Sequence, residues 1–111
     1  MAHTNPDIEK EIVITGLGII SAIGNNLDDN LRSLRQDKTG LAPIHRLETT
    51  HKNEYVAGEV KLSNKELNNT LNIKANLPRT TLLALTAAHE ALSSAKFSGK
   101  PENKNGVILG R

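Results

Sequence analysis

The patterned part of the chain starts with three consecutive β-branched residues, Ile12, Val13 and Ile14, followed by Gly16 and Gly18. A continuous β-branched run is typical of a strand that is covered on both faces. Glycines directly after such a run favour a turn or a close approach between backbones. The pattern therefore predicts a first strand whose residues 12–14 are inaccessible to solvent, followed by a glycine turn.

Leucines spaced i, i+4 and i+7 predict an amphipathic helix after this turn. Asn25 or Asn26 is placed to cap its first turn, where acidic residues follow, and Gly40 is placed to stop it. The leucines are Leu27, Leu31 and Leu34.

Residues 41–53 show neither helical nor strand periodicity, and residues 55–61 predict a second strand. Ser63 and Glu66 have the spacing of a capping box and predict a short helix that ends near Asn72. A second long helix is predicted from Arg79 to about Lys96, with Pro78 suited to its first turn.

One wide face of this second long helix is rich in alanine, and small side chains let another backbone approach closely. We expect the helix to lie flat on a sheet or on a partner. The residues of the face are Ala84, Ala87, Ala88, Ala91, Leu92 and Ala95.

A short apolar run at residues 106–110 predicts a third buried strand, so the expected order is β–α–β–α–β. Strands joined by helical crossovers pair in parallel, which predicts an α/β fold. The last strand would then be only half covered. Residues 1–10 are polar and are expected to form a lead-in outside the domain at 11–111.

The composition excludes several classes of function. The 111 residues include no cysteine, which rules out disulfides, thiolate metal sites and thiol catalysis within this chain. A net charge of +2 with only 2% aromatic residues argues against nucleic-acid binding. No apolar run is as long as a membrane helix, and residues 1–10 lack the apolar centre of a signal peptide, so we expect a cytoplasmic protein.

The glycine turn is a weak candidate for a dinucleotide site. Gly16 and Gly18 fit the beginning of the pattern G-x-G-x-x-G, but Ser21 occupies the position of the third glycine. The predicted helix also starts too late to point its N-terminus at a pyrophosphate. Glycines that serve the packing of a tight loop are the favoured interpretation, and we expect no cofactor.

The remaining candidates form no catalytic or metal-binding set. His45 and His51 are spaced poorly for a metal, and Ser21 has no histidine or acid near it in the sequence. His3 belongs to the polar lead-in, and His89 lies at the rim of the apolar arc of the second helix. Glu59 and Glu90 are carboxylates without an evident pairing. No catalytic, cofactor-binding or metal-binding residue is assigned.

Five short blocks, in order along the chain, resemble the N-terminal signature of the β-ketoacyl-acyl carrier protein synthases. A departure is Ala22, at a position where proline is common in that family. The blocks are residues 13–18 with 20–25, residues 38–41 with 44–47, residues 57–60, residues 87–92 and residues 106–110.

This resemblance implies that the chain is the β–α–β–α–β start of a thiolase-like α/β/α layered domain. It implies a condensing enzyme of fatty acid or type II polyketide synthesis, with acyl carrier protein as a partner and a homo-oligomeric state. The acyl-carrying cysteine, two histidines and lysine of the family belong to its later part. None of these residues lies within residues 1–111, so the chain alone is expected to be inactive.

The alternative is a non-catalytic binding or assembly module that uses part of the same fold. A reading frame that continues past Arg111 into a segment with a cysteine and two spaced histidines would favour the enzyme.

Overall fold

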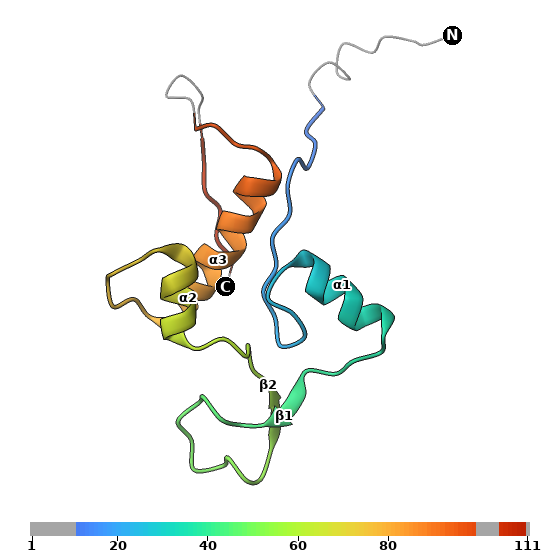
Figure 1. The fold of residues 1–111 in the computed structure, drawn as a ribbon, viewed down its shortest axis with the longest axis vertical. Coiled ribbons are helices and arrows are strands. Elements are labelled where there is room, and N and C mark those ends of the chain that lie inside the picture. Colours follow the sequence, from blue (N-terminus) through green and yellow to red (C-terminus); the bar gives the residue numbers. More distant parts are fainter. Residues whose placement is uncertain (1–10, 100–104, 111) are drawn as a thin grey trace.

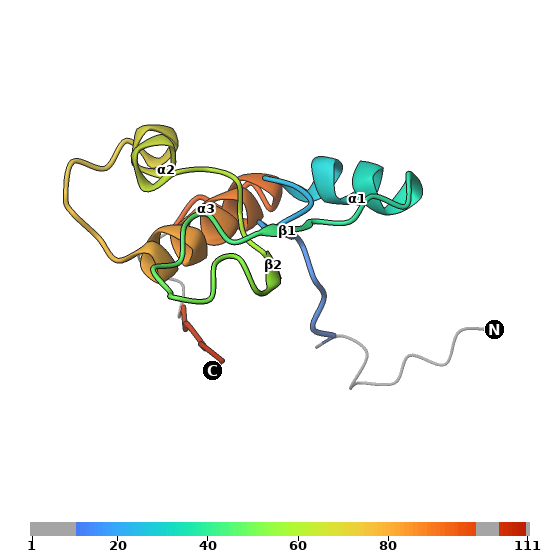
Figure 2. The ribbon, with the colours of Figure 1, turned by 90° about the horizontal axis from the view of Figure 1, so that it is seen from below.

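The computed structural model describes residues 11–99 and 105–110 (Figure 1). These residues form three helices and one two-stranded sheet, so the chain combines α and β elements. Helices α2 and α3 lie side by side, and residues 11–20 pass between α3 and α1 (Figures 1 and 2). The elements are α1 (Leu27–Arg35), β1 (Leu41–Pro43), β2 (Val56–Gly58), α2 (Asn64–Leu71) and α3 (Arg79–Ser94).

Helix α1 forms where the leucine spacing predicts it and is capped by Asn26, whose side chain accepts a hydrogen bond from the backbone N–H of Asp29 at 2.8 Å. It ends earlier than expected, because Gln36 caps it and Asp37 has a positive φ of 52°. Its leucine stripe is not its inner face: Leu34 is 62% exposed, whereas Asn30 is buried.

Helix α2 is the predicted capping-box helix. The Ser63 hydroxyl accepts the Glu66 N–H at 3.2 Å, and the Glu66 carboxylate accepts the Ser63 N–H at 2.7 Å. These two bonds satisfy N–H groups that a helix leaves unpaired at its start. Asn72 ends the helix in the left-handed conformation, with φ 54°, which confirms the predicted end.

Helix α3 begins at Arg79 as predicted, but Pro78 occupies the N-cap position, without a side-chain capping hydrogen bond, rather than lying inside the first turn. Its inner side packs on α2 through Leu82, and α2 contributes Leu67. Both leucines are fully buried, and the remaining buried apolar residue is Ile44, in the part of the chain that the structure describes. The core is therefore small and lies mainly between α2 and α3.

The predicted parallel pairing is wrong. The two observed strands are consecutive and antiparallel, with Ala42 opposite Ala57 at the centre of the pair. The connection at residues 44–55 contains no helix, so no crossover is present to bring the strands parallel. The first of these strands falls in a stretch predicted to be irregular, and the second occupies three residues of the predicted 55–61.

The prediction of buried strands at the two ends of the domain is also wrong. Residues 12–14 and 107–109 have no regular secondary structure and are unpaired, and Ile12 and Ile108 are 100% and 98% exposed. An extended segment needs a neighbouring strand to pair its N–H and C=O groups. No other described segment of the chain lies alongside to pair with either one, so β-branched sequence alone does not form a strand here.

We predict that Leu82→Ala destabilises the chain by about 2–5 kcal/mol, because it leaves a cavity at the fully buried contact between α3 and α2. The matched control is Leu92→Ala on the same helix, where the side chain is 50% exposed and the loss is smaller. Urea unfolding followed by circular dichroism measures both. Equal losses for the two variants would show that α2 and α3 do not form the core.

Candidate functional site

The glycine segment lies directly on the backbone of α3. A Cβ atom added at Gly18 would sit 1.9 Å from the carbonyl oxygen of Ala87, and one at Gly16 would sit 2.2 Å from that of Ala91. No side chain fits in either place. The alanine face of α3 thus receives another backbone closely, as the sequence predicts, but the backbone belongs to an unpaired segment rather than to a sheet.

Glu90 joins this segment to α1. One of its carboxylate oxygens accepts the Ile19 N–H at 2.9 Å, and the other accepts the Leu27 N–H at 2.8 Å. Leu27 is the first residue of α1, where backbone N–H groups lack partners within the helix. A single side chain of α3 therefore holds both ends of the loop at residues 19–27.

The interior of this loop is held by polar side chains of α1. The buried Asn30 amide donates to the carbonyl oxygens of Gly24 at 3.1 Å and Asn26 at 2.7 Å. Its own oxygen accepts the Ser21 hydroxyl. The Ser33 hydroxyl donates to the Ile23 carbonyl at 2.6 Å. The Ser21 hydroxyl is thus engaged with an amide, which is no base, and the arrangement gives Ser21 no support as a nucleophile.

The β1–β2 pair also lies close to the loop at residues 19–27. A Cβ atom at Gly40 would lie 2.5 Å from the Cβ atom of Ala22, so only glycine fits there. The role assigned to Gly40 from sequence, to stop the first helix, is wrong because that helix ends at Arg35. Gly40 instead lets the segment before β1 approach Ala22.

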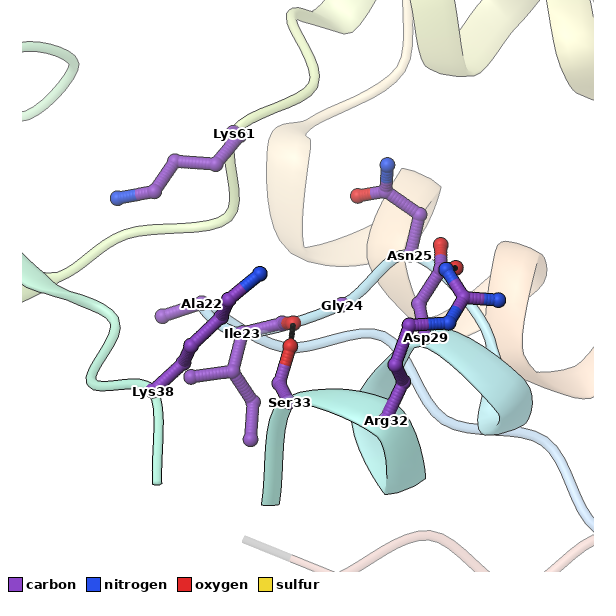
Figure 3. A pocket seen from close by; sticks show the side chains of 9 residues that line it. All are labelled: Ala22, Ile23, Gly24, Asn25, Asp29, Arg32, Ser33, Lys38 and Lys61. Atoms are coloured by element: carbon purple, nitrogen blue, oxygen red, sulfur yellow. Dashed lines mark hydrogen bonds and ion pairs between the residues drawn. The ribbon is translucent and has the colours of Figure 1, made fainter. Parts of the chain in front are cut away.

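Between these elements lies an open pocket of about 250 Å³ (Figure 3). The loop at residues 22–25 forms one wall, and α1 contributes Asp29, Arg32 and Ser33. Lys38, which follows α1, and Lys61, which follows β2, complete it. The pocket carries three cationic side chains and one carboxylate.

Glu59 holds a different loop through its carboxylate. It accepts backbone N–H groups from His45 at 2.8 Å, Leu47 at 2.9 Å and Arg46 at 3.0 Å. These hydrogen bonds lower the pKa of Glu59 below its ordinary value of 4.5, and the bond from His45 has the largest effect. Glu59 and Glu90 therefore each bind their own set of backbone amides and do not form an acid–base pair.

The histidines remain separate in the described residues. His51 Nδ1 lies at hydrogen-bond distance from Glu54 Oε2, at 2.8 Å, and the His51 ring lies edge-on to Tyr55. His89 lines a pocket formed by α3, the end of α2 and the residues before α1. No group of three potential metal ligands occurs among residues 11–99 and 105–110. His3 and the polar lead-in lie outside the described residues.

Sequence reasoning missed the structural roles of Glu90 and Asn30. A signal existed for Asn30, which lies inside a helix near two leucines, whereas Glu90 lies outside the alanine-rich face of its helix and was assigned to the other side. A polar residue in such a position indicates that a backbone segment requires a hydrogen-bonding partner there. Which segment it holds depends on the three-dimensional arrangement.

The family described as beta-ketoacyl synthase, N-terminal domain, matches residues 9–111. The chain belongs to this family.

Individual relatives agree with this assignment to the β-ketoacyl synthases. The chain is 35% identical to a 3-oxoacyl-[acyl-carrier-protein] synthase 1 of Buchnera aphidicola subsp. Baizongia pistaciae, over 91% of this chain and 26% of that protein. It is 32% identical to the synthase 1 of Escherichia coli and to a synthase 2 of Staphylococcus aureus, each over 91% of this chain and 25% of the relative.

The chain therefore spans about a quarter of the length of these synthases. No solved structure matches it. None of the helices in the described part of the chain is long and apolar enough to cross a membrane.

We predict that Gly18→Ala destabilises the chain by about 1–3 kcal/mol, because the new methyl group would overlap the Ala87 carbonyl and push the segment off α3. Gly106→Ala is the matched control: a Cβ atom there meets nothing within 4 Å, so the change should stay within about 0.5 kcal/mol. Urea unfolding measures both. Equal stability of the two variants would contradict the observed contact.

We also predict that Glu59 adds stability that depends on pH. Its pKa is lower in the folded state than in the unfolded state, so its contribution is present above the unfolded pKa and is lost as the pH falls through the folded pKa. Glu59→Gln should lower the melting temperature at about pH 7, and this deficit should shrink as the pH falls below the ordinary pKa of 4.5. The control is Glu48→Gln in the same loop, which accepts none of these amides. A deficit that persists unchanged at low pH would contradict the prediction.

Proposed function

We propose that this chain is the N-terminal part of a 3-oxoacyl-[acyl-carrier-protein] synthase. Such an enzyme condenses an acyl thioester with malonyl-carrier protein in fatty acid or type II polyketide synthesis. The observation that carries the proposal is the family match over residues 9–111, together with relatives of that name that align with 91% of the chain.

The part played by residues 11–111 in the proposed enzyme is structural. The chain has no cysteine to carry an acyl group, and its well-placed carboxylates, Glu59 and Glu90, bind backbone N–H groups. We propose that the nucleophile and its supporting residues come from the rest of the enzyme. The loop that follows Gly16 and Gly18 is held between α1 and α3, and the rest of the enzyme packs against it.

The proposal includes a thiolase-like layered domain in the complete enzyme. It is supported by the apolar segments 12–14 and 107–109, whose exposed side chains and unpaired backbones suit strands of a larger sheet. The alanine and leucine residues on the outer side of α3, such as Ala84 and Leu85, line a groove of about 480 Å³ together with Val107 and Leu109. A second layer would cover that groove.

Acyl carrier protein is the partner that this proposal requires, since the relatives' names contain it. We also propose a homo-oligomer, supported by the exposed apolar side chains at both ends of the described chain. A cytoplasmic setting completes the proposal and is consistent with a sequence without cysteine.

A chimera tests the function directly. Residues 9–111 replace the matched segment of the Escherichia coli synthase 1, and the purified chimera is incubated with an acyl thioester and malonyl-carrier protein. We predict ketoacyl product from the chimera and none above background from the 111-residue chain alone, which lacks a thiol nucleophile.

Two controls make the result decisive. A chimera whose acyl-carrying cysteine is replaced by alanine measures the background, and thermal unfolding shows whether each chimera is folded. A folded chimera without product would overturn the proposal and favour a non-catalytic binding module. Product from the isolated chain that survives removal of contaminating synthase would contradict the structural role assigned to it.

A further inference from the structure

The open pocket beside the glycine loop has a surplus of positive charge that the packing of the loop does not explain. Arg32, Lys38 and Lys61 line it from three separate places in the sequence, and Asp29 is the one carboxylate among the lining residues (Figure 3). The nearest ion pair is local: Arg32 Nη1 lies 3.3 Å from Asp29 Oδ1. The charge of the lining is therefore +2 after Asp29 is counted.

The two lysines account for this surplus. Neither Lys38 nor Lys61 has a carboxylate within ion-pair distance among residues 11–99 and 105–110. The Lys61 ammonium donates one hydrogen bond, to the Gly40 carbonyl at 3.3 Å, which leaves two N–H donors. In Figure 3 the Lys38 amine lies beside the loop at Ala22–Gly24, so it is near the pocket wall rather than extended away from it.

The backbones that carry the cations are anchored. The Lys38 N–H donates to the Ser33 carbonyl at 3.0 Å, just past the end of α1. The Lys61 carbonyl accepts the Arg46 guanidinium, and the neighbouring Val60 carbonyl accepts Arg79 at 2.8 Å. The loop wall itself is held by Asn30 and Ser33, as described above. The backbones of the two lysines are thus held at fixed points around one cavity.

We propose that this pocket binds a phosphate group. A phosphate monoester carries a charge of about −1.5 to −2 at neutral pH, which matches the lining charge of +2, whereas a single carboxylate does not. Lysine ammonium groups act as compact charges that can contact phosphate oxygens from several directions. A volume of about 250 Å³ has room for the group without burying a large organic body.

The phosphate can come from inorganic phosphate or from a small phosphate monoester, and the two share the same contacts. This inference is independent of the condensing activity proposed above, because neither the nucleophile nor the carrier protein takes part. Its success or failure in the full 111-residue chain leaves that proposal unchanged.

The experiment is a titration of the full chain, labelled with ¹⁵N, by inorganic phosphate at constant ionic strength and pH, followed by NMR. We expect saturable shifts of the backbone amides of residues 22–25, 33, 38 and 61. Lys38→Ala and Lys61→Ala should each weaken binding about two- to fivefold, as expected for exposed ion pairs. A parallel titration with glycerol 3-phosphate separates the two sources: tighter binding of the ester identifies an organic phosphate.

The matched control is Lys65→Ala on α2, whose side chain does not line the pocket, and it should leave the affinity unchanged. Lys38→Arg and Lys61→Arg keep the charge and should keep binding, which separates loss of charge from loss of folding. Shifts that do not saturate, shifts away from the pocket, or an equal loss in Lys65→Ala would each overturn the proposal.

Discussion

The contact on which the rest of the structure depends is the approach of Gly16 and Gly18 to the backbone of α3. Because no Cβ atom fits between Gly18 and the Ala87 carbonyl, the segment at residues 16–18 lies closer to the helix than any other residue type would allow. Glu90, one turn further along the same helix, then reaches the N–H groups at both ends of the following loop. The position of α1 follows from this, since its first N–H group is one of the two that Glu90 binds. Two glycines that lie against one helix thus determine where two other parts of the chain lie.

Several polar side chains of the described residues form hydrogen bonds with main-chain groups of loops. Glu90, Glu59 and the buried Asn30 each bind two or more main-chain groups of loops that make few regular hydrogen bonds of their own. Backbone groups left without water or partners are costly, so a chain rich in loops needs such side chains. This explains how a family member can contain acids, histidines and a serine in a glycine loop without a catalytic arrangement among them. Lys38 at the open pocket differs, because its ammonium group binds no main-chain group of the described residues.

The centre of the described chain is tightly held, while its apolar ends are open. The fully buried side chains are Leu67 and Leu82, whereas Ile12, Ile14, Val107 and Ile108 are largely exposed. The chain spans about a quarter of the length of its synthase relatives, and under the proposal above a larger sheet covers the open apolar segments. Helix α1 shows the same contrast: its polar Asn30 faces inward, and its leucine stripe, with Leu34, faces out. An apolar pattern predicts that a surface will be covered, but the covering group need not belong to the same 111 residues.

The sequence by itself determined the features that depend on neighbours close along the chain. The Asn26 cap, the Ser63–Glu66 capping box, the left-handed end at Asn72 and the extent of α3 all arise from interactions within a few residues, and the structure confirms them. The order of short blocks also indicated the family, which the matched residues 9–111 show. Only the tertiary structure decided the pairing and exposure of the extended segments, because a strand exists through its neighbour and residues 12–14 have none in the described chain. It alone decided that Gly40 approaches Ala22, that Glu90 joins two elements, and that Lys38 and Lys61 meet at one pocket. Each of these contacts joins residues that are far apart in the sequence, and a local sequence pattern does not determine how close such residues lie in space.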